Sequence, residues 1–274
     1  MMSPDQQLDR KTFDRVRGLI HQRAGIALGD SKQAMVQGRL AKRLRALRVD
    51  SLPSYLDQLD GNPQSDEWQH FTNALTTNLT AFFRESHHFE HLAQQLRLAK
   101  GQDLFRIWCS ASSTGEEPWS IAMVVDEVGQ QGPRKVEIMA TDIDTQVLQT
   151  AAQGIYQLER IEGLSLARRQ RFFLKGQGPK LGRCRVRPEL LKRVQFQQLN
   201  LLSGHWFIEA PLDVVFCRNV MIYFEKASQR DLVRRFAALL KPGGHLYVGH
   251  SESQFHCEDV LDLVERTTYR RRAP

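Results

Sequence analysis

The sequence predicts an α/β protein in which an all-α N-terminal domain precedes a doubly wound, mainly parallel β-sheet with a small inserted β-subdomain. Residues up to about Leu98 carry helical periodicity and no convincing strand, whereas strands and helices alternate from Asp103 onward. The connection from Ile155 to Arg193 is too long for a simple crossover. We therefore expect a helical domain at 1–76, a linker at 77–102 and the sheet domain at 103–274, with the insertion at about 174–190.

The elements of the N-terminal domain follow from apolar spacing and turn residues. A helix is expected within 31–49, because one stripe of it is formed by Val36, Leu40, Leu44 and Leu47. A second helix begins in "DSLPSYLDQL" with Pro53 near its first turn, where proline is tolerated. The turn that starts at Gly61 precedes a third helix.

The elements of the larger domain are apolar runs bounded by caps. Strands are expected at 104–109, 136–142, 194–200, 212–219 and 245–250. One helix starts at Glu116 with Pro118 in its first turn, and another is capped by Asp144 and ended by Gly154. The helix that starts at Gln229 is expected to stop at the Pro-Gly-Gly of "LKPGGHLYVGH".

Composition limits the classes of protein that the chain can be. It is 41% apolar and 25% charged, as in an ordinary globular protein. No run approaches the ~20 apolar residues that span a bilayer, and the N-terminus lacks the apolar part of a secretory signal, so we expect a cytoplasmic protein with reduced cysteines. His87 and His91 have a spacing that can ligate zinc, but they have no cysteine or acidic partner at metal spacing, so no metal is expected.

Basic residues are concentrated in two runs. Lys32 to Arg48 contains six basic residues and no acid, and Arg160 to Arg193 contains eleven basic residues against two acids. Each run is a candidate surface for an anionic partner, with a solvated helix face as the alternative.

The ligand site is expected beyond the carboxyl ends of the strands. The first strand leads into "SASSTGEEP", whose small side chains let a ligand approach the backbone at a helix N-terminus. The chain has no G-x-G-x-x-G motif and no Walker lysine, and Glu116 and Glu117 favour a cation such as an amino group over a phosphate. Asp142 ends the second strand, where an acid commonly binds both ribose hydroxyls of a nucleoside.

These features together indicate S-adenosylmethionine (SAM), which combines a nucleoside with an amino group and has no phosphate. Each feature alone has a plainer explanation as a helix cap or a turn. Their recurrence at successive strand ends favours the cofactor, and the fold class becomes that of the class I SAM-dependent methyltransferases.

The motifs "NLTAFFRE", "SASSTGEEPWSIAM", "ATDIDTQVL", "FCRNVMIYF" and "LKPGGHLYVGHSES" resemble those of the CheR family, the chemotaxis receptor (protein-glutamate) methyltransferases. The similarity runs from about Phe13 to Tyr269 in the same order. It implies a reaction in which SAM donates a methyl group to glutamate side chains in the cytoplasmic helices of a chemoreceptor, giving γ-glutamyl methyl esters for chemotactic adaptation.

The resemblance also implies functional residues. Phe82 and Phe83 would hold the linker over the cofactor, and Arg84 and Tyr223 would orient the acceptor, although Tyr223 fits a core aromatic as well. No general base is needed, because a glutamate with an ordinary pKa of about 4.3 is already ionised near pH 7. The cofactor would be bound by Asn78, Thr80, Arg84, Glu117, Asp142, Asn200, Leu201, Cys217 and Arg218.

Two partner surfaces are implied in the same way. The receptor helices would face Arg39 and Arg45, with help from Lys42 and Arg43. A receptor C-terminal pentapeptide would add as a strand to the insertion, through Gly176, Gly178, Gly182, Arg183, Arg185 and Arg187. A blunted edge strand that binds nothing is the alternative for the second surface.

Two other functions compete with this interpretation. A nucleic-acid methyltransferase would also be basic, but the basic runs lack interleaved aromatic residues and the chain has no "NPPY"-like tetrapeptide. A non-catalytic adaptor could keep the fold, but the presence of Arg84, Asp142 and Tyr223 argues against it. Neither nucleic acid nor insertion into a membrane is expected.

Overall fold

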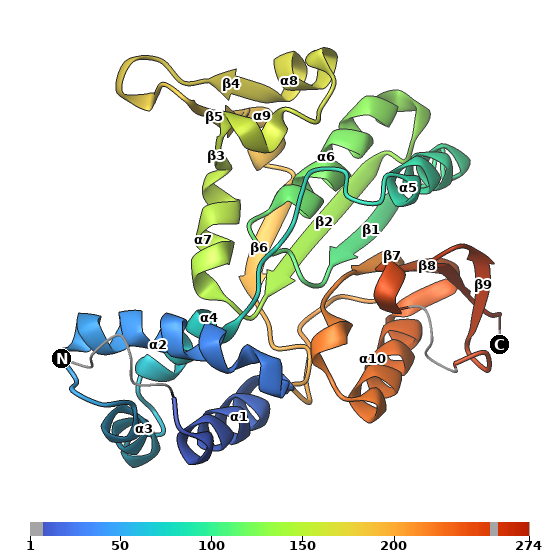
Figure 1. Cartoon of the computed structure of the whole chain (residues 1–274). Helices are drawn as coiled ribbons and strands as arrows, with labels where there is room; N and C mark the ends of the chain where they lie inside the picture. Colours follow the sequence, from blue (N-terminus) through green and yellow to red (C-terminus); the bar gives the residue numbers. More distant parts are fainter. Residues whose placement is uncertain (1–7, 253–256, 274) are drawn as a thin grey trace.

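The N-terminal domain is a group of helices around its own core (Figure 1). The computed structural model describes residues 8–252 and 257–273. The helices of this domain are α1 (Arg10–Ala24), α2 (Gln33–Leu47), α3 (Leu52–Gly61) and α4 (Glu67–Leu75). Pro53 lies in the first turn of α3, as predicted. In the predicted stripe of α2, Val36, Leu40 and Leu44 are buried, but Leu47 is 39% exposed because the helix ends at this residue.

The larger domain is built on a seven-stranded sheet in the order β6-β2-β1-β7-β8-β10-β9. The strands β6, β2, β1, β7 and β8 are parallel, and β10 is antiparallel to both β8 and β9, which confirms the doubly wound, mainly parallel prediction. Their bounds are β1 (Leu104–Cys109), β2 (Lys135–Asp142), β6 (Val194–Gln198), β7 (Leu212–Cys217), β8 (Leu240–Val248), β9 (Leu261–Glu265) and β10 (Thr268–Arg271).

Helices bury both faces of this sheet. The helices are α5 (His87–Leu98), α6 (Glu116–Val128), α7 (Thr145–Gln153) and α10 (Lys226–Leu239). Alternation along β1 divides the core: Ile107 and Cys109 pack with α5 and α6, whereas Trp108 packs with α10. The predicted caps of α7 are present, since Asp144 accepts hydrogen bonds from the first-turn amides and Gly154 has a left-handed φ of 60°.

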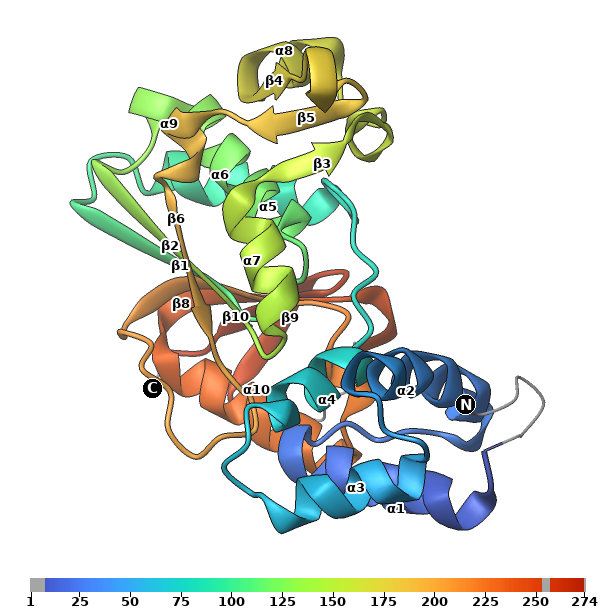
Figure 2. The ribbon, with the colours of Figure 1, turned by 90° about the vertical axis from the view of Figure 1, so that its left-hand side faces the viewer.

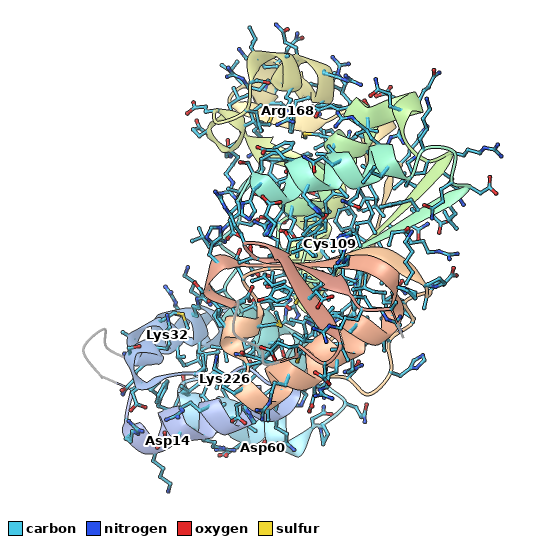
Figure 3. The ribbon with its side chains drawn as sticks, turned by 90° about the vertical axis from the view of Figure 1, so that its right-hand side faces the viewer. Asp14, Lys32, Asp60, Cys109, Arg168 and Lys226 are labelled. Carbon is cyan, nitrogen blue, oxygen red and sulfur yellow. The ribbon has the colours of Figure 1, made fainter. Side chains whose placement is uncertain are left out.

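The insertion forms a second, antiparallel sheet in the order β3-β5-β4, beyond α7 (Figures 1 and 2). Its elements are β3 (Ile155–Gln157), α8 (Leu166–Phe172), β4 (Phe173–Lys175), β5 (Arg183–Val186) and α9 (Pro188–Leu191). The sheet therefore uses residues before 174 as well. It lies at the opposite end of the molecule from the N-terminal domain, as the positions of Arg168, Asp14 and Asp60 make clear in Figure 3.

One expected helix end is wrong. Pro242 and the two glycines after it do not stop a helix, because α10 ends at Leu239 and Leu240 already has an extended conformation. The register of β8 on β7 jumps from Leu240 opposite Leu212 to His245 opposite Val214. The Pro-Gly-Gly segment is therefore a bulge inside β8, consistent with proline's inability to donate to a ladder.

Cys109, Cys184, Cys217 and Cys257 are all buried free thiols. Within residues 8–252 and 257–273, no helix has the length and apolarity required to cross a bilayer.

Candidate active site between the two domains

A cleft lies where the carboxyl ends of β1, β2, β6 and β7 meet the linker and the N-terminal domain. Its volume is about 1110 Å³, including the part open to solvent. Most of the residues predicted to bind the cofactor or the acceptor line it: Asn78, Thr80, Arg84, Glu117, Asp142, Asn200, Leu201, Arg218 and Tyr223. Cys217 is fully buried, and its side chain lies in the core behind the wall.

The loop after β1 brings backbone close to the cleft. Ser110, Ala111 and Ser113 line it with small side chains, and α6 begins just after Gly115. Gly115 has φ 100°, and a Cβ atom there would lie 2.8 Å from that of Ala151. Only glycine therefore fits this turn, which points the N-terminus of α6 at the cleft.

Asp142 is held at the end of β2 by backbone amides. Its Oδ2 accepts from the amide of Ser113 at 2.8 Å, and its Oδ1 accepts from that of Asp144 at 3.0 Å. Burial raises the pKa of Asp142 to about 6, against the opposing effect of these hydrogen bonds. The carboxylate is thus fixed in direction and available to hydroxyl donors from a ligand.

Glu117 and Glu85 both pair with Arg218. Arg218 is 5% exposed, donates to Glu117, and places Nη2 3.3 Å from Oε2 of Glu85. Glu85 also lies 4.0 Å from Arg84, whereas Glu117 lines the cleft, where its carboxylate suits an incoming ammonium group. Glu116 does not line the cleft, because it pairs with Arg160 and accepts from the hydroxyl of Thr114 at 2.6 Å.

The two phenylalanines of the sequence "FFR" hold the linker in place by aromatic packing. Phe82 packs edge-on against Tyr156 and Phe173, with ring centroids at 5.2 and 5.5 Å. Phe83 packs on Phe89 at 5.0 Å, and the guanidinium of Arg168 lies 3.9 Å from its ring centroid. These contacts keep the segment across the cleft, where the guanidinium of Arg84 donates to the carbonyl of Leu79 at 3.1 Å.

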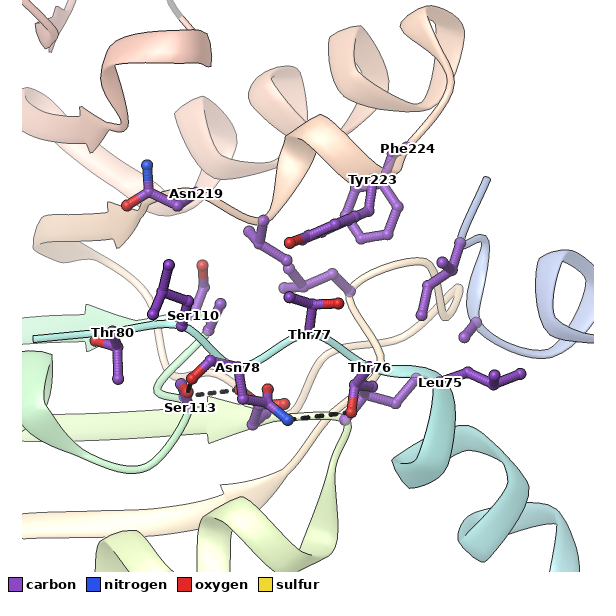
Figure 4. Close-up of a pocket in the computed structure, with 18 of the residues that line it drawn as sticks. Leu75, Thr76, Thr77, Asn78, Thr80, Ser110, Ser113, Asn219, Tyr223 and Phe224 are labelled. Atoms are coloured by element: carbon purple, nitrogen blue, oxygen red, sulfur yellow. Dashed lines mark hydrogen bonds between the residues drawn. The ribbon is translucent and has the colours of Figure 1, made fainter. Parts of the chain in front are cut away.

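Tyr223 projects its hydroxyl into the space above Thr77, and its ring packs against the core of the N-terminal domain (Figure 4). Its loop is held by side chains from two elements. Glu252 accepts from the amides of Asn219 and Met221 at 2.6 and 2.7 Å, and Gln229 donates to the carbonyl of Met221 at 2.8 Å. Both the core-aromatic and the site interpretation of Tyr223 therefore describe part of its surroundings.

The four basic residues predicted to meet the receptor have different surroundings. Lys42 and Arg45 are exposed on α2. Arg43 is paired with Glu67, which also accepts from the hydroxyl of Tyr55 at 2.7 Å. Arg39 is half-buried and donates to the carbonyls of Ala74 and Thr76, where the linker begins.

The predicted peptide-binding residues lie around β5, which is the central strand of the small sheet and not an edge. Arg183 and Arg185 project outward from β5, while Arg187 follows it and donates to the carbonyl of Gln170 at 3.2 Å. The glycines shape the connection between β4 and β5. Gly178 and Gly182 have φ of 54° and 82°, and a Cβ on Gly176 would lie 2.0 Å from the carbonyl oxygen of Lys180.

Sequence reasoning missed one wall of the cleft. Ala24, Ile26, Ala27 and Leu28 line it from the N-terminal domain, together with Lys32 and Met35. No local pattern marks these residues, because they become lining residues only when the two domains pack together. The amide of Ala27 donates to the carbonyl of Tyr223 at 2.8 Å, which joins this wall to the opposite domain.

Two family models match the chain in the order of its domains. A model described as CheR methyltransferase, all-alpha domain, matches residues 11–76, and one described as CheR methyltransferase, SAM binding domain, matches residues 78–270. The chain belongs to the CheR methyltransferase family. The family prediction is confirmed, and SAM is the cofactor of this CheR protein.

Curated relatives are similar over nearly the full length. The chain is 49% identical over 257 residues to the chemotaxis protein methyltransferase of Salmonella typhimurium, covering 94% of this chain and 88% of that protein. It is 51% identical to the one of Klebsiella aerogenes, with the same coverage. It is 48% identical over 263 residues to chemotaxis protein methyltransferase 2 of Pseudomonas aeruginosa, covering 95% and 92%.

The residues of the cleft fit SAM. Asp142 offers a fixed carboxylate for ribose hydroxyls, and Glu117 lines the cleft with a carboxylate that suits an amino group. Arg84 lines the same cleft and offers a cation to a carboxylate. When bound, SAM supplies a methyl group activated by its sulfonium.

Proposed function

We propose that this CheR protein methylates glutamate side chains in the cytoplasmic helices of chemoreceptors, forming γ-glutamyl methyl esters in chemotactic adaptation. The observation that carries the proposal is the composition of one cleft. The acids Asp142 and Glu117 line it together with Arg84 and Tyr223, beneath a linker that joins the SAM-binding domain to a basic helical domain.

The residues of the chain have orienting roles in this reaction. Arg84 and Tyr223 hold the acceptor carboxylate, which arrives ionised and needs no base. A tight ion pair with Arg84 would reduce the nucleophilicity of the acceptor, so its role is to position the carboxylate, and good alignment can contribute ~7–11 kcal/mol. The cofactor is held by Asn78, Thr80, Arg84, Glu117, Asp142, Asn200, Leu201, Cys217 and Arg218, with Cys217 acting through its position at the end of β7.

The direct test is incubation of the protein with methyl-labelled SAM and purified cytoplasmic fragments of chemoreceptors. We expect label on the fragment that mild base releases as methanol, the property of a carboxyl methyl ester. A fragment whose acceptor glutamates are replaced by alanine is the matched control and should stay unlabelled. Base-stable label, or label on added RNA and none on receptor, would contradict the proposal.

We also propose that the small sheet binds a receptor C-terminal pentapeptide by strand addition. The free edges of the sheet are β3 and β4, and the exposed Arg183 and Arg185 lie beside both on the central strand. In register, Arg185 lies between Ile155 and Leu174, which are 40% and 41% exposed. A cation flanked by apolar side chains suits a short peptide that carries an acid and an apolar residue.

Titration of a fluorescent receptor pentapeptide tests this second proposal. We expect micromolar binding that the Arg185→Glu variant weakens at least tenfold, whereas Arg45→Glu on the distant helix α2 leaves it unchanged. A flat titration with the wild-type protein at high concentration would contradict the proposed peptide site. It would not contradict the proposed methyltransferase function.

A further inference from the structure

The start of the linker is held from both domains at once. From the N-terminal domain, the guanidinium of Arg39 on α2 donates to the carbonyls of Ala74 and Thr76. From the SAM-binding domain, Oδ2 of Asp144 accepts from the hydroxyl of Thr76 at 2.6 Å and from the side-chain amide of Asn78 at 3.0 Å. Thr76 therefore has its carbonyl bound by one domain and its hydroxyl bound by the other.

The same contacts continue into the cofactor site. The amide of Asn78 also donates to the hydroxyl of Thr76 at 3.1 Å, and the carbonyl of Asn78 accepts from the hydroxyl of Ser113 at 3.2 Å (Figure 4). Asp142, next to Ser113 in the cleft, accepts the amides of Ser113 and Asp144. The position of Asn78 at the cleft is thus fixed through Asp144, Thr76 and Ser113.

The two central members of this arrangement, Thr76 and Asp144, are shielded from water. Thr76 is 8% exposed and Asp144 is 2% exposed. A buried donor or acceptor that loses its partner carries the full cost of its desolvation, so the arrangement is stable only when every member is in place. Small displacements of the linker are therefore disfavoured.

We infer that Arg39 and Asp144 are positioning residues, which hold the linker segment 76–78 so that the cofactor site is complete, and that Arg39 therefore acts on cofactor binding even in the absence of receptor. This inference rests on the proposed function of the cleft. It couples the basic helix α2 to the cofactor through Arg39 and Thr76. It adds a role to the sequence-based prediction, in which Arg39 contacts the receptor directly.

Cofactor binding in the absence of receptor separates the two roles of Arg39. Isothermal titration with S-adenosylhomocysteine should show about tenfold weaker binding for Arg39→Ala than for the wild type. Arg45→Ala is the matched control, because Arg45 lies on the same helix and, among the described residues, its side chain donates only to the carbonyl of Ala41 in its own helix, at 3.3 Å. Equal affinities for wild type, Arg39→Ala and Arg45→Ala would overturn the inference for Arg39.

Asp144→Asn tests the other side of the segment. Asparagine is as good an N-cap as aspartate, so the cap that Oδ1 makes to the amides of Gln146 and Val147 is retained. Its amide nitrogen cannot accept from Asn78, so the contact with the linker is lost. We expect a tenfold higher KM for SAM with at least half of the wild-type kcat at saturation, and faster hydrogen exchange at 76–80.

The outcomes of these experiments are distinct. A lower unfolding temperature with unchanged KM and unchanged linker exchange would reduce Asp144 to a helix cap and overturn its positioning role. If the wild-type protein itself binds no S-adenosylhomocysteine, the proposed function of the cleft fails, and not merely this inference.

Discussion

Arg84 lines the cleft, and the two phenylalanines that precede it in the linker are packed against other aromatic rings. Its side chain is 37% exposed, with one neutral hydrogen bond to Leu79 and a long ion pair with Glu85 at 4.0 Å, so its removal should leave the fold intact. We predict that Arg84→Ala lowers methyl transfer more than tenfold in an assay with saturating SAM and receptor fragment, with an unchanged circular dichroism melt. Turnover close to that of the wild type would remove Arg84 from the mechanism.

The pKa of Asp142, raised to about 6, predicts a pH dependence of cofactor binding. Ribose hydroxyls donate better to the ionised carboxylate, so affinity for S-adenosylhomocysteine should rise as pH increases through about 6. The raised pKa has the opposite effect on the stability of the unliganded protein. Between the ordinary pKa of 3.8 and about 6 only the folded state holds the proton, so the contribution of Asp142 to stability falls as pH rises.

Titration calorimetry between pH 5 and pH 7.5 measures the binding effect, and proton uptake or release follows from buffers of different ionisation enthalpy. The Asp142→Asn variant should bind more weakly with a flatter pH profile. A wild-type affinity that is constant from pH 5 to pH 7.5 would contradict the role assigned to this carboxylate.

At the scale of elements, α2 separates charges that bind within the protein from charges that face solvent. Lys42 and Arg45 are exposed, whereas Arg43 is paired with Glu67. Because exposed charges act mainly on association, Lys42→Glu with Arg45→Glu should raise the KM for receptor several-fold, reduce its salt dependence and leave cofactor affinity unchanged. Stopped-flow association at two ionic strengths measures the effect.

Arg43→Met is the control for that prediction. It should lower the unfolding free energy by about 1–3 kcal/mol, because it leaves Glu67 half-buried without its cation, while receptor association keeps its salt dependence. If the charge reversals at Lys42 and Arg45 changed neither KM nor its salt dependence, α2 would not face the receptor.

Elements were predictable where their signals are local. The Asp144 and Gly154 caps of α7 and the first-turn proline of α3 are decided by neighbouring residues, and the structure has them. The Pro-Gly-Gly segment was misread because the same residues stop a helix or make a bulge, and only the pairing of β8 with β7 decides between the two. The position of β5 at the centre of its sheet likewise depends on β3, a strand of three residues with no signal of its own.

At the scale of the whole molecule, His88 links the packing of the linker to acid stability. It is fully buried, and its Nε2 forms a hydrogen bond with the hydroxyl of Thr267 at 2.8 Å. The charged or titratable groups near it are Glu85, Arg218, His87 and His250. Burial, then the charge of Arg218, lowers its pKa to about 2. Below the ordinary pKa of 6.5 only the unfolded chain takes up this proton, so stability is lost as pH falls.

We predict that His88 contributes about 1.6 kcal/mol in total to the loss of unfolding free energy between pH 6.5 and pH 5, because the unfolded histidine is half protonated at pH 6.5 and almost fully protonated at pH 5. Urea unfolding at both pH values measures it, and His88→Gln should reduce the difference between them by a similar amount. A variant with the same pH dependence as the wild type would assign acid sensitivity to other groups.

The motifs in the sequence located most of the cleft, because its predicted residues lie where topology brings them together: in the linker (Asn78), in the first turn of α6 (Glu117) and at strand ends (Asp142 and Arg218). They could not locate Ala27 or Met35, which become part of the cleft only through the packing of two separately folded cores. The sequence also shows which residues are charged but not what they bind. Arg39 and Arg43 look alike in the sequence, but Arg39 binds backbone carbonyls and Arg43 binds a carboxylate.

The wall formed by Ala24 to Leu28 has a consequence for exchanging parts between homologous enzymes. A chimera that takes its helical domain from another CheR protein, in order to change the receptor that it modifies, also acquires a foreign surface for the donor molecule. Such a hybrid should show a changed Michaelis constant for SAM even when its catalytic half is untouched. Redesign of receptor choice should therefore graft the outer face of α2 and keep the native inner face.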